Sequence, residues 1–236
     1  LGMNTPGGFG EYIRVPAGWV TALPEGLSTR ESMVIGTAGF TAALCLDKIE
    51  AMGGKPSDGP VLVTGATGGV GSIAVMLLAK QGYEVIASSG KADKTDYLKS
   101  LGATTVITRD ELLEVDKRPM VAPKWAHSID CVGGEILSNV IKGLQPLGSV
   151  AICGLVASPA FTTTVMPFIL RGVNILGIDS VQIPIEYKNR IWDKLANEWK
   201  LSGLDAATQE VGLADLSKVI EAIFAGQVSG RTLVTH

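Results

Sequence analysis

Three glycines spaced by three residues form the stretch of this sequence with the clearest chemistry. Gly65, Gly68 and Gly71 follow a short apolar run at residues 61–64 and precede an apolar segment at 70–81. A glycine turn between a strand and a helix lets the backbone approach a pyrophosphate, whose charge the N–H groups of the helix start then bind. The spacing differs by one residue from the usual G-x-G-x-x-G. We therefore predict cofactor-binding roles for Gly65, Gly68, Gly69, Val70 and Gly71.

The end of the next apolar run, residues 84–88, carries hydroxyl groups and a cation. Ser89, Gly90 and Lys91 stand where an NAD site would place an acidic residue for the ribose 2′-hydroxyl. Hydroxyl donors and a positive charge instead favour a 2′-phosphate. Arg109, after the following run, is a second cation for the same edge. The alternative for Lys91 and Arg109 is an ordinary exposed side chain.

Metal-binding and nucleophilic patterns are missing from the sequence. Cys45, Cys131 and Cys153 have no C-x-x-C spacing, and His127 and His236 stand alone. A zinc site needs several such ligands together, so we expect no metal. Buried free thiols are the ordinary interpretation of the three cysteines. The sequence contains no G-x-S-x-G elbow, so this motif gives no support to a hydrolase.

Apolar runs alternate with helical patterns around these residues. Strands are predicted at 61–64, 84–88, 104–108, 128–132, 149–153 and 174–178, with helices at 70–81, 94–100 and 136–145. Nearly continuous apolar strands that alternate with helices indicate a parallel sheet covered on both faces. Six of them predict an α/β fold with a doubly wound parallel sheet, the Rossmann fold.

The two ends of the chain have other patterns. Short strands are predicted at 9–15 and 19–23, before a capping box formed by Ser28 and Glu31. Helical segments follow at 33–52, with interruptions at Gly36 and Gly39. Near the carboxyl end, the pattern predicts helices at 185–201 and 213–225 and a closing strand at 231–234.

Composition limits the classes of partner. The chain has 236 residues, 46% of them hydrophobic, and a net charge of −3. Without a basic stripe, a nucleic acid is not expected as a partner. We see no signal peptide and no apolar run of membrane-spanning length, and therefore expect no membrane association. Three widely spaced cysteines favour a reducing compartment, so we expect a cytoplasmic protein.

Several segments resemble the zinc-independent medium-chain dehydrogenase/reductases, in the branch of acrylyl-CoA reductases and quinone oxidoreductases. The resemblance covers the whole chain and is carried by residues 7–12, 36–42, 65–71, 97–103, 166–172 and 177–181. It implies that the Gly68–Gly71 turn holds a pyrophosphate and that Ser89, Gly90, Lys91 and Arg109 contact the cofactor, NADPH. Arginine is common in this branch where the chain has Lys91, which keeps the charge but loses the bidentate fork.

The resemblance also assigns residues to the nicotinamide end of the cofactor. It places Leu155, Ile169 and Ser180 in the segments that line this end, and Thr37 near the nicotinamide. A helix cap or a core position is the alternative for Thr37. No catalytic residue is assigned.

The resemblance implies three segments and an activity. Residues 1–50 would be the later part of a GroES-like catalytic domain with a linking helix, 51–181 the Rossmann domain, and 182–236 a return to the catalytic domain. The family's first half of the catalytic domain, with an Asn-Tyr-Lys-Asp motif, would lie upstream of Leu1. The implied activity is NADPH-dependent reduction of an activated C=C bond in an acryloyl-CoA-like thioester, by a homodimer. The alternatives are an NADPH:quinone oxidoreductase and a non-catalytic cofactor-binding fragment.

Overall fold

A six-stranded parallel sheet forms the centre of the molecule. The computed structural model describes residues 2, 5–114 and 117–236. The sheet has the order β3-β2-β1-β4-β5-β6, and every neighbouring pair is parallel. Its strands are β1 (Val61–Val63), β2 (Val85–Ser89), β3 (Thr105–Thr108), β4 (Trp125–Asp130), β5 (Leu144–Ile152) and β6 (Asn174–Gly177). This order is that of the Rossmann fold, so the predicted fold class is confirmed.

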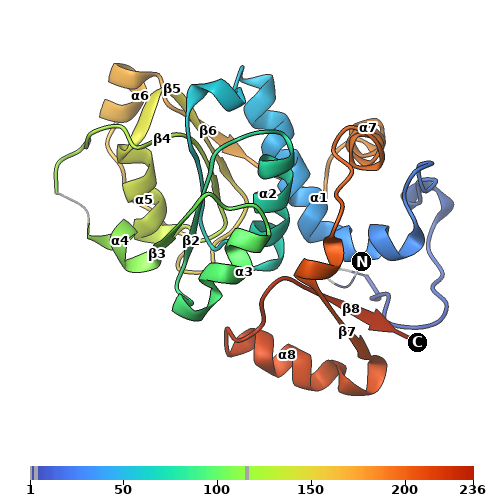
Figure 1. Cartoon of the computed structure of the whole chain (residues 1–236). Helices are drawn as coiled ribbons and strands as arrows, with labels where there is room; N and C mark the ends of the chain where they lie inside the picture. Colours follow the sequence, from blue (N-terminus) through green and yellow to red (C-terminus); the bar gives the residue numbers. More distant parts are fainter. Residues whose placement is uncertain (1, 3–4, 115–116) are drawn as a thin grey trace.

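Helices cover both faces of the sheet (Figure 1). One face carries α1 (Thr29–Ala51), α2 (Gly69–Lys80) and α3 (Thr95–Ser100), and the other carries α4 (Arg109–Leu113), α5 (Gly134–Lys142) and α6 (Met166–Arg171). Val61 and Val63 of β1 face the first core, whereas Leu62 faces the second. This alternation follows from the period of two in a strand. It explains why β1 is apolar throughout.

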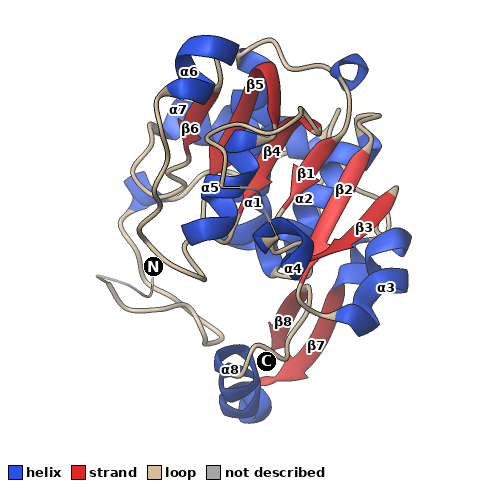
Figure 2. Cartoon of the chain, turned by 90° about the vertical axis from the view of Figure 1, so that its left-hand side faces the viewer, coloured by secondary structure: helices blue, strands red, loops and turns tan. Residues whose placement is uncertain are grey.

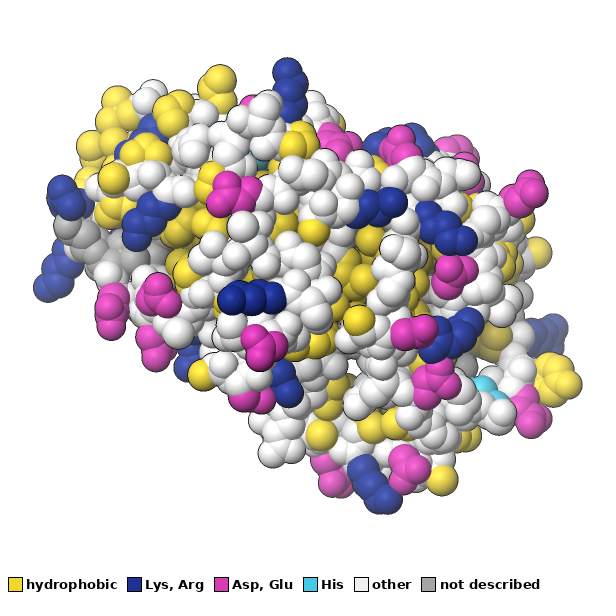
Figure 3. Space-filling model, in the orientation of Figure 1, with side chains coloured by type: hydrophobic (Ala, Val, Ile, Leu, Met, Phe, Trp, Pro, Cys, Tyr) yellow, Lys and Arg dark blue, Asp and Glu magenta, His cyan; other side chains and the backbone are white. Residues whose placement is uncertain are grey.

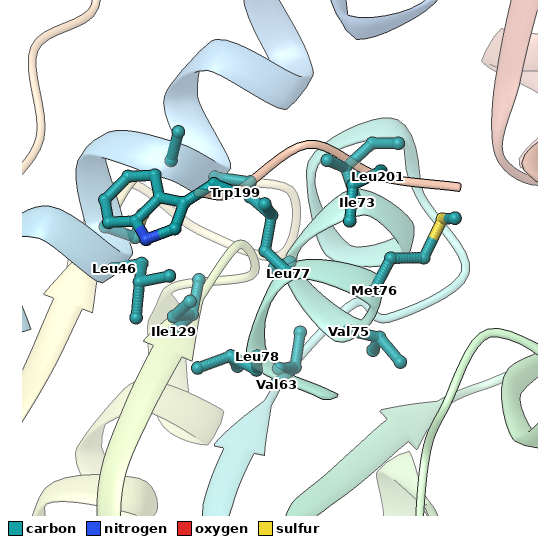
Figure 4. Close-up of a cluster of buried hydrophobic side chains, with 14 of the residues drawn as sticks. Leu46, Val63, Ile73, Val75, Met76, Leu77, Leu78, Ile129, Trp199 and Leu201 are labelled. Carbon is teal, nitrogen blue, oxygen red and sulfur yellow. The ribbon is translucent and has the colours of Figure 1, made fainter. Parts of the chain in front are cut away.

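The larger core joins the sheet to the C-terminal half of the chain. Figure 4 shows Trp199 packed among side chains of α1 and α2, such as Leu46 and Leu77. Trp199 follows α7 (Ile185–Ala196), which ends earlier than the predicted limit at residue 201. Burying an aromatic side chain of this size contributes several kcal/mol, on the order of 3. This packing therefore holds the end of α7 against the helices that cover the six-stranded sheet.

Helix α1 begins as predicted and has one break. The side chain of Ser28 accepts from the Glu31 backbone N–H, and the Glu31 carboxylate accepts from the Ser28 N–H. Gly36 has φ 48° and ψ −159°, which breaks the helix there. The predicted interruption at Gly39 is wrong, because Gly39 stays helical and packs closely against Ile35 and Ile73.

The expectation about membrane-length segments needs a correction. Among the described residues one helix, α1, is long and apolar enough to cross a membrane by length and composition. Two thirds of its most apolar window, 67%, is buried inside the protein. A core helix of a globular domain can have the same length and apolar composition. Helix α1 packs against α2 and β5 as such a core helix does.

The two strands expected near the amino end do not form. Residues 5–16 have no regular structure, and Ala17–Trp19 form a 3₁₀ helix. Phe9 and Tyr12 are 65% and 93% exposed. In the described part of the chain no neighbouring strand pairs with this segment, and alternation alone does not hold a strand without a ladder partner.

A small second sheet lies near the carboxyl end, and one of its two strands was predicted from the sequence. β7 (Thr208–Gly212) pairs in parallel with β8 (Arg231–Thr235), and α8 (Leu216–Phe224) connects them. β8 was expected, whereas β7, α4 and α6 were not. In Figure 2 the β7–β8 pair lies below the edge of the large sheet at which β2 and β3 end.

A charged cluster fixes α7 to α1. Asp47 is 6% exposed and accepts from both Nη atoms of Arg190, at 2.8 and 2.7 Å, and from the Tyr187 hydroxyl at 2.9 Å. Lys194 Nζ lies 3.2 Å from the same carboxylate. Burial opposes ionisation, but the hydrogen bonds from Arg190, Tyr187 and Lys194 outweigh it and lower the pKa of Asp47. The ionised carboxylate is therefore part of the folded state.

Replacing Asp47 by asparagine should lower the free energy of unfolding by about 3 kcal/mol, because Arg190, Tyr187 and Lys194 lose the charge of the buried carboxylate that they bind. The folded pKa of Asp47 is depressed, so its contribution is complete above the unfolded value of about 3.9 and is lost as pH falls through the lower folded value. Urea unfolding of both proteins at several pH values measures the difference. The control is Asp193→Asn on the exposed side of α7; an equal loss in both variants would contradict the role of the cluster.

Candidate functional site

The glycine turn is shaped by a close contact between backbones. Gly65 has φ 61°, and its carbonyl accepts the Gly68 N–H at 2.9 Å. A Cβ at Gly71 would collide with the Gly65 carbonyl oxygen and would lie 2.7 Å from the Cα of Ala66. Only glycine therefore lets α2 start directly behind the turn. The first residues of α2, Gly69 and Val70, line a cavity, and the N–H groups of a helix start are suited to bind a phosphate.

A buried carboxylate holds the ends of β1 and β4 together beneath the turn. Asp130 accepts from the Thr64 hydroxyl at 2.7 Å and from the Gly133 N–H at 2.8 Å. Thr64 Oγ1 also accepts the Cys131 N–H at 3.1 Å. Burial is the largest effect on Asp130 and raises the pKa of its carboxyl group. These bonds position the carboxyl edge of the sheet, where ligands bind in open α/β folds.

A cavity of about 380 Å³ opens at this edge, and we call it the Ser89 cavity. It brings together five of the predicted residues: Gly65, Ser89, Gly90, Lys91 and Arg109. Thr64, Thr67 and Ser88 add polar groups, and Val132, Ile136, Val156, Ala157 and Gly226 complete the wall. The lining combines apolar walls with a few polar groups and two cations, which is typical of a small-molecule site.

Lys91 is fixed by the carboxyl end of the chain. Its Nζ donates to the Val228 carbonyl at 2.6 Å and to Ser229 Oγ at 3.2 Å. Burial lowers the pKa of this ammonium group. Its backbone N–H donates to Ser89 Oγ at 3.0 Å. Because an ammonium group has three donors, Lys91 keeps one for a ligand.

Arg109 lies next to Gly90, and its side chain is 60% exposed. The guanidinium carbon would be 3.5 Å from a Cβ at Gly90. Its Nε is 3.8 Å from Asp110, a long and exposed contact. Arg109 therefore reaches the same edge as Lys91, as predicted from the sequence.

A second cavity, of about 620 Å³, adjoins the first, since Val156 lines both. We call it the Gly69 cavity. Its lining includes Gly68, Gly69 and Val70 of the predicted set. Gly71 is buried behind them, where it packs against the turn and does not line the cavity. The far side of this cavity is made of α8 and β8 side chains.

Arg231 lies in the Gly69 cavity and was missed by the sequence analysis. Its Nε donates to the Val34 carbonyl at 2.8 Å. Its Nη2 lies 2.9 Å from the position that a Cβ on Gly36 would take. Its Nη1 lies 2.8 Å from the corresponding position on Gly69. Burial lowers the pKa of this guanidinium, and no ion pair of Arg231 occurs within the described residues. Arg231 lies 162 positions after Gly69 in the sequence, so no local pattern predicts that it reaches the glycine turn.

The residues expected at the nicotinamide end are not gathered into one cavity. Thr37 is exposed directly after the break in α1. Leu155 is 63% exposed and precedes two residues of the Ser89 cavity, and Ser180 lies in the loop after β6. Ile169 is 73% exposed on α6. The structure does not bring Ile169 to the turn, because α6 lies beside the start of β5, where Arg171 binds the Leu144 carbonyl.

No three His, Cys, Asp or Glu side chains gather into a metal site in residues 2, 5–114 and 117–236. His127 is buried and accepts the Ser149 N–H through Nδ1 at 3.2 Å, while its Nε2 lies 3.3 Å from Asp58. Burial lowers the pKa of this imidazole. His127 thus has a structural position at the amino end of the sheet.

The fold order and the glycine turn at the carboxyl edge define a dinucleotide-binding domain. A family model described as zinc-binding dehydrogenase matches residues 69–197. The chain belongs to this family, the medium-chain dehydrogenase/reductases. The family description names zinc, but the described side chains do not fit a zinc site, and we derive no step from this metal.

Three relatives show the branch. The probable acrylyl-CoA reductase AcuI of Escherichia coli K12 is 46% identical over 99% of this chain and 72% of its own length. The putative quinone oxidoreductase YhfP of Bacillus subtilis is 43% identical over 99% of this chain and 71% of its own length. The yhdH oxidoreductase of Salmonella enterica, in complex with NADP, has a TM-score of 0.96 and 47% identity over 100% of this chain and 72% of its own. YhfP has a structure with NAD bound, with a TM-score of 0.91 and 42% identity over 94% of this chain and 68% of its own.

Gly71→Ala should lower the free energy of unfolding by about 1–3 kcal/mol, because the new methyl group overlaps the Gly65 backbone. Thermal and urea unfolding measure this loss. Gly212→Ala is the matched control, since nothing lies within 4 Å of its Cβ position and its φ is −73°. A loss below about 0.5 kcal/mol for Gly71→Ala, the size expected of a surface change, would show that the turn has room for a side chain.

Proposed function

We propose that the chain is an NADPH-dependent oxidoreductase. The observation that carries the proposal is the end of β2, where Ser88, Ser89 and Lys91 line the cavity and no carboxylate of the described residues does. An acidic residue there would bind the ribose hydroxyl of NAD and would repel a 2′-phosphate. The NADP complex of the similar Salmonella protein supports this choice.

The residues of the two cavities have complementary tasks in this proposal. The N–H groups of Gly69 and Val70 bind the pyrophosphate, Gly68 lets it approach the backbone closely, and Arg231 compensates its charge. Ser89, the free donor of Lys91 and the exposed Arg109 bind the 2′-phosphate. Because Arg231 and Lys91 are held by carbonyl and hydroxyl oxygens, neither charge is neutralised before the cofactor binds.

For the substrate we propose an activated C=C bond in an acryloyl-CoA-like thioester, in agreement with the name of the E. coli relative. Bound NADPH would supply a hydride to the β-carbon. The chain would provide hydrogen-bond donors for the enolate oxygen, because charge develops there during reduction. Thr37 and Ser180 are the hydroxyl side chains that we propose for the nicotinamide end, with Leu155 as further lining.

A quinone is the second candidate substrate. The observation in its favour is the name of the B. subtilis relative, a putative quinone oxidoreductase. The third alternative, a cofactor-binding protein without turnover, differs from both in having no reduced product.

The remaining assignments are also proposals. We propose the division into residues 1–50, 51–181 and 182–236, zinc-independent chemistry, a cytoplasmic location, and no nucleic-acid or membrane partner. The free thiols at Cys45, Cys131 and Cys153 favour the cytoplasm. Helix α1, which ends at the first proposed boundary, packs onto α2 and β5 and shares their core.

The edge strand β6 should mediate a homodimer. β6 ends the sheet order, and an unpaired edge is a template for another strand. Figure 3 shows hydrophobic side chains gathered at the α6 end of the molecule. Exposed apolar side chains in this region are Leu147, Val165, Met166, Ile169, Leu170 and Ile175.

Ile175→Lys should shift a dimer toward monomer, because the charge would be buried at the two-fold axis. Sedimentation velocity measures the mass of each species. Phe224→Lys on α8 is the control, as Phe224 is 88% exposed on a different surface. A wild-type protein that sediments as a monomer at all concentrations would refute the dimer.

Lys91→Ala should reduce the preference for NADPH over NADH by on the order of 1–3 kcal/mol, the contribution of a charge-assisted hydrogen bond. Fluorescence titration with each cofactor gives the two Kd values. Lys99→Ala on the exposed side of α3 should leave both unchanged. Arg231→Met is the contrasting variant and should weaken both cofactors alike, because the pyrophosphate is common to them. Equal wild-type Kd values for NADPH and NADH would contradict the assignment.

The activity itself is tested with deuterium-labelled NADPH and either acryloyl-CoA or benzoquinone. We expect deuterium in the propionyl product, faster turnover with the thioester than with the quinone, and no effect of a zinc chelator. Thr37→Val should lower kcat more than it changes the NADPH Kd, with Thr95→Val on α3 as the control. Faster quinone reduction would support the second candidate, and NADPH binding without turnover of either compound would exclude both.

A further inference from the structure

Two thiols lie side by side at the carboxyl edge of the sheet. Cys131 and Cys153 each follow the last residue of a strand, and these last residues, Asp130 and Ile152, are partners in the β4–β5 register. The two Sγ atoms are 3.7 Å apart. Neighbouring strands are separated by about 4.8 Å, within the Cα spacing of about 4.4–6.8 Å that a disulfide bridges. The backbone therefore already has the separation that a disulfide requires.

The three cysteines differ in access and acidity. Cys131 and Cys153 are partly exposed, whereas Cys45 is fully buried. The Cys153 thiol donates to the Asp130 carbonyl at 3.4 Å, and hydrogen bonding with Cys131 and Cys45 lowers the pKa of Cys153. Hydrogen bonding to Cys153 and burial raise the pKa of Cys131. Cys153 is thus the first of the three to ionise, and the thiolate is the form that reacts with oxidants.

We propose that Cys131 and Cys153 form a reversible disulfide when a hydroperoxide oxidises the protein. The Cys153 thiolate attacks one peroxide oxygen, the O–O bond breaks, and hydroxide leaves and is protonated to water. The Cys131 sulfur then attacks the resulting sulfenic acid: an S–S bond forms, the S–O bond breaks, and the departing hydroxide takes the Cys131 proton as water. In sum, two thiols and one H₂O₂ give one disulfide and two waters.

The disulfide would change the cofactor site. Cys131 is followed by Val132, which lines the Ser89 cavity, and Cys153 is followed by the segment with Val156, which lines both cavities. A Cβ at Gly65 would be 3.4 Å from the Cβ of Cys131, so the turn rests on this residue. Closing the gap from 3.7 Å to a bond of about 2.05 Å draws these segments together. This consequence, unlike the disulfide itself, rests on the proposed NADPH function.

Peptide mapping tests the disulfide directly. The native protein is treated with one equivalent of H₂O₂, blocked with iodoacetamide and digested with trypsin without reduction. We expect peptides 125–142 and 143–171 linked, peptide 31–48 alkylated and unlinked at Cys45, and reversal by dithiothreitol. Cys45→Ser should leave the link intact, whereas Cys131→Ser and Cys153→Ser should each abolish it. Sulfinic acid at Cys153 without a link, a link to Cys45, or two free thiols after excess peroxide would each overturn the proposal.

Cofactor binding tests the consequence separately. NADPH should bind about tenfold more weakly to the oxidised protein, a change equivalent to 1.4 kcal/mol. The Kd of Cys131→Ser should not respond to peroxide. An unchanged Kd in a protein whose disulfide is shown by mapping would refute the effect on the site, while loss of NADPH binding in the reduced protein would refute the proposed function alone.

Discussion

The contact between Gly71 and the Gly65 turn is the constraint on which the site depends. Because no side chain separates them, α2 begins directly against the end of β1, and its first residues, Gly69 and Val70, line the Gly69 cavity. The same closeness requires Gly69 and Gly36 to lack side chains, since the Arg231 guanidinium occupies the space between them. The break in α1 at Gly36 therefore makes room for Arg231 beside the Gly69 cavity and is not an isolated irregularity.

The carboxyl end of the chain completes what the turn begins. Gly230 donates its N–H to the Thr67 carbonyl at 2.8 Å, and Val228 and Ser229 hold the Lys91 ammonium group. The adjacent Arg231 reaches the start of α2. One short segment thus sets the position of both cations. A displacement of residues 226–231 would alter the pyrophosphate end and the 2′-phosphate end together.

The parts of the fold that the sequence predicted are those with a local signal. Buried strands such as β1 are apolar throughout, and the Ser28–Glu31 box has a fixed spacing. The strand expected at 9–15 has the right alternation but no ladder partner among the described residues. The turn and the end of β2 were predictable from residue types at a fixed distance. Arg231 and the tether of Lys91 were not, because both depend on contacts between distant segments.

Similar folds of this family have been solved with different cofactors. YhfP, at 42% identity and a TM-score of 0.91, has been solved with NAD, and the Salmonella protein, at 47% and 0.96, with NADP. Both backbones are closely similar to this one, so the fold alone does not select between the two cofactors. In this chain the end of β2 offers hydroxyl groups and a cation whose partners are neutral oxygens. A phosphate would gain a counter-charge there, whereas a ribose hydroxyl would find no carboxylate to accept its proton.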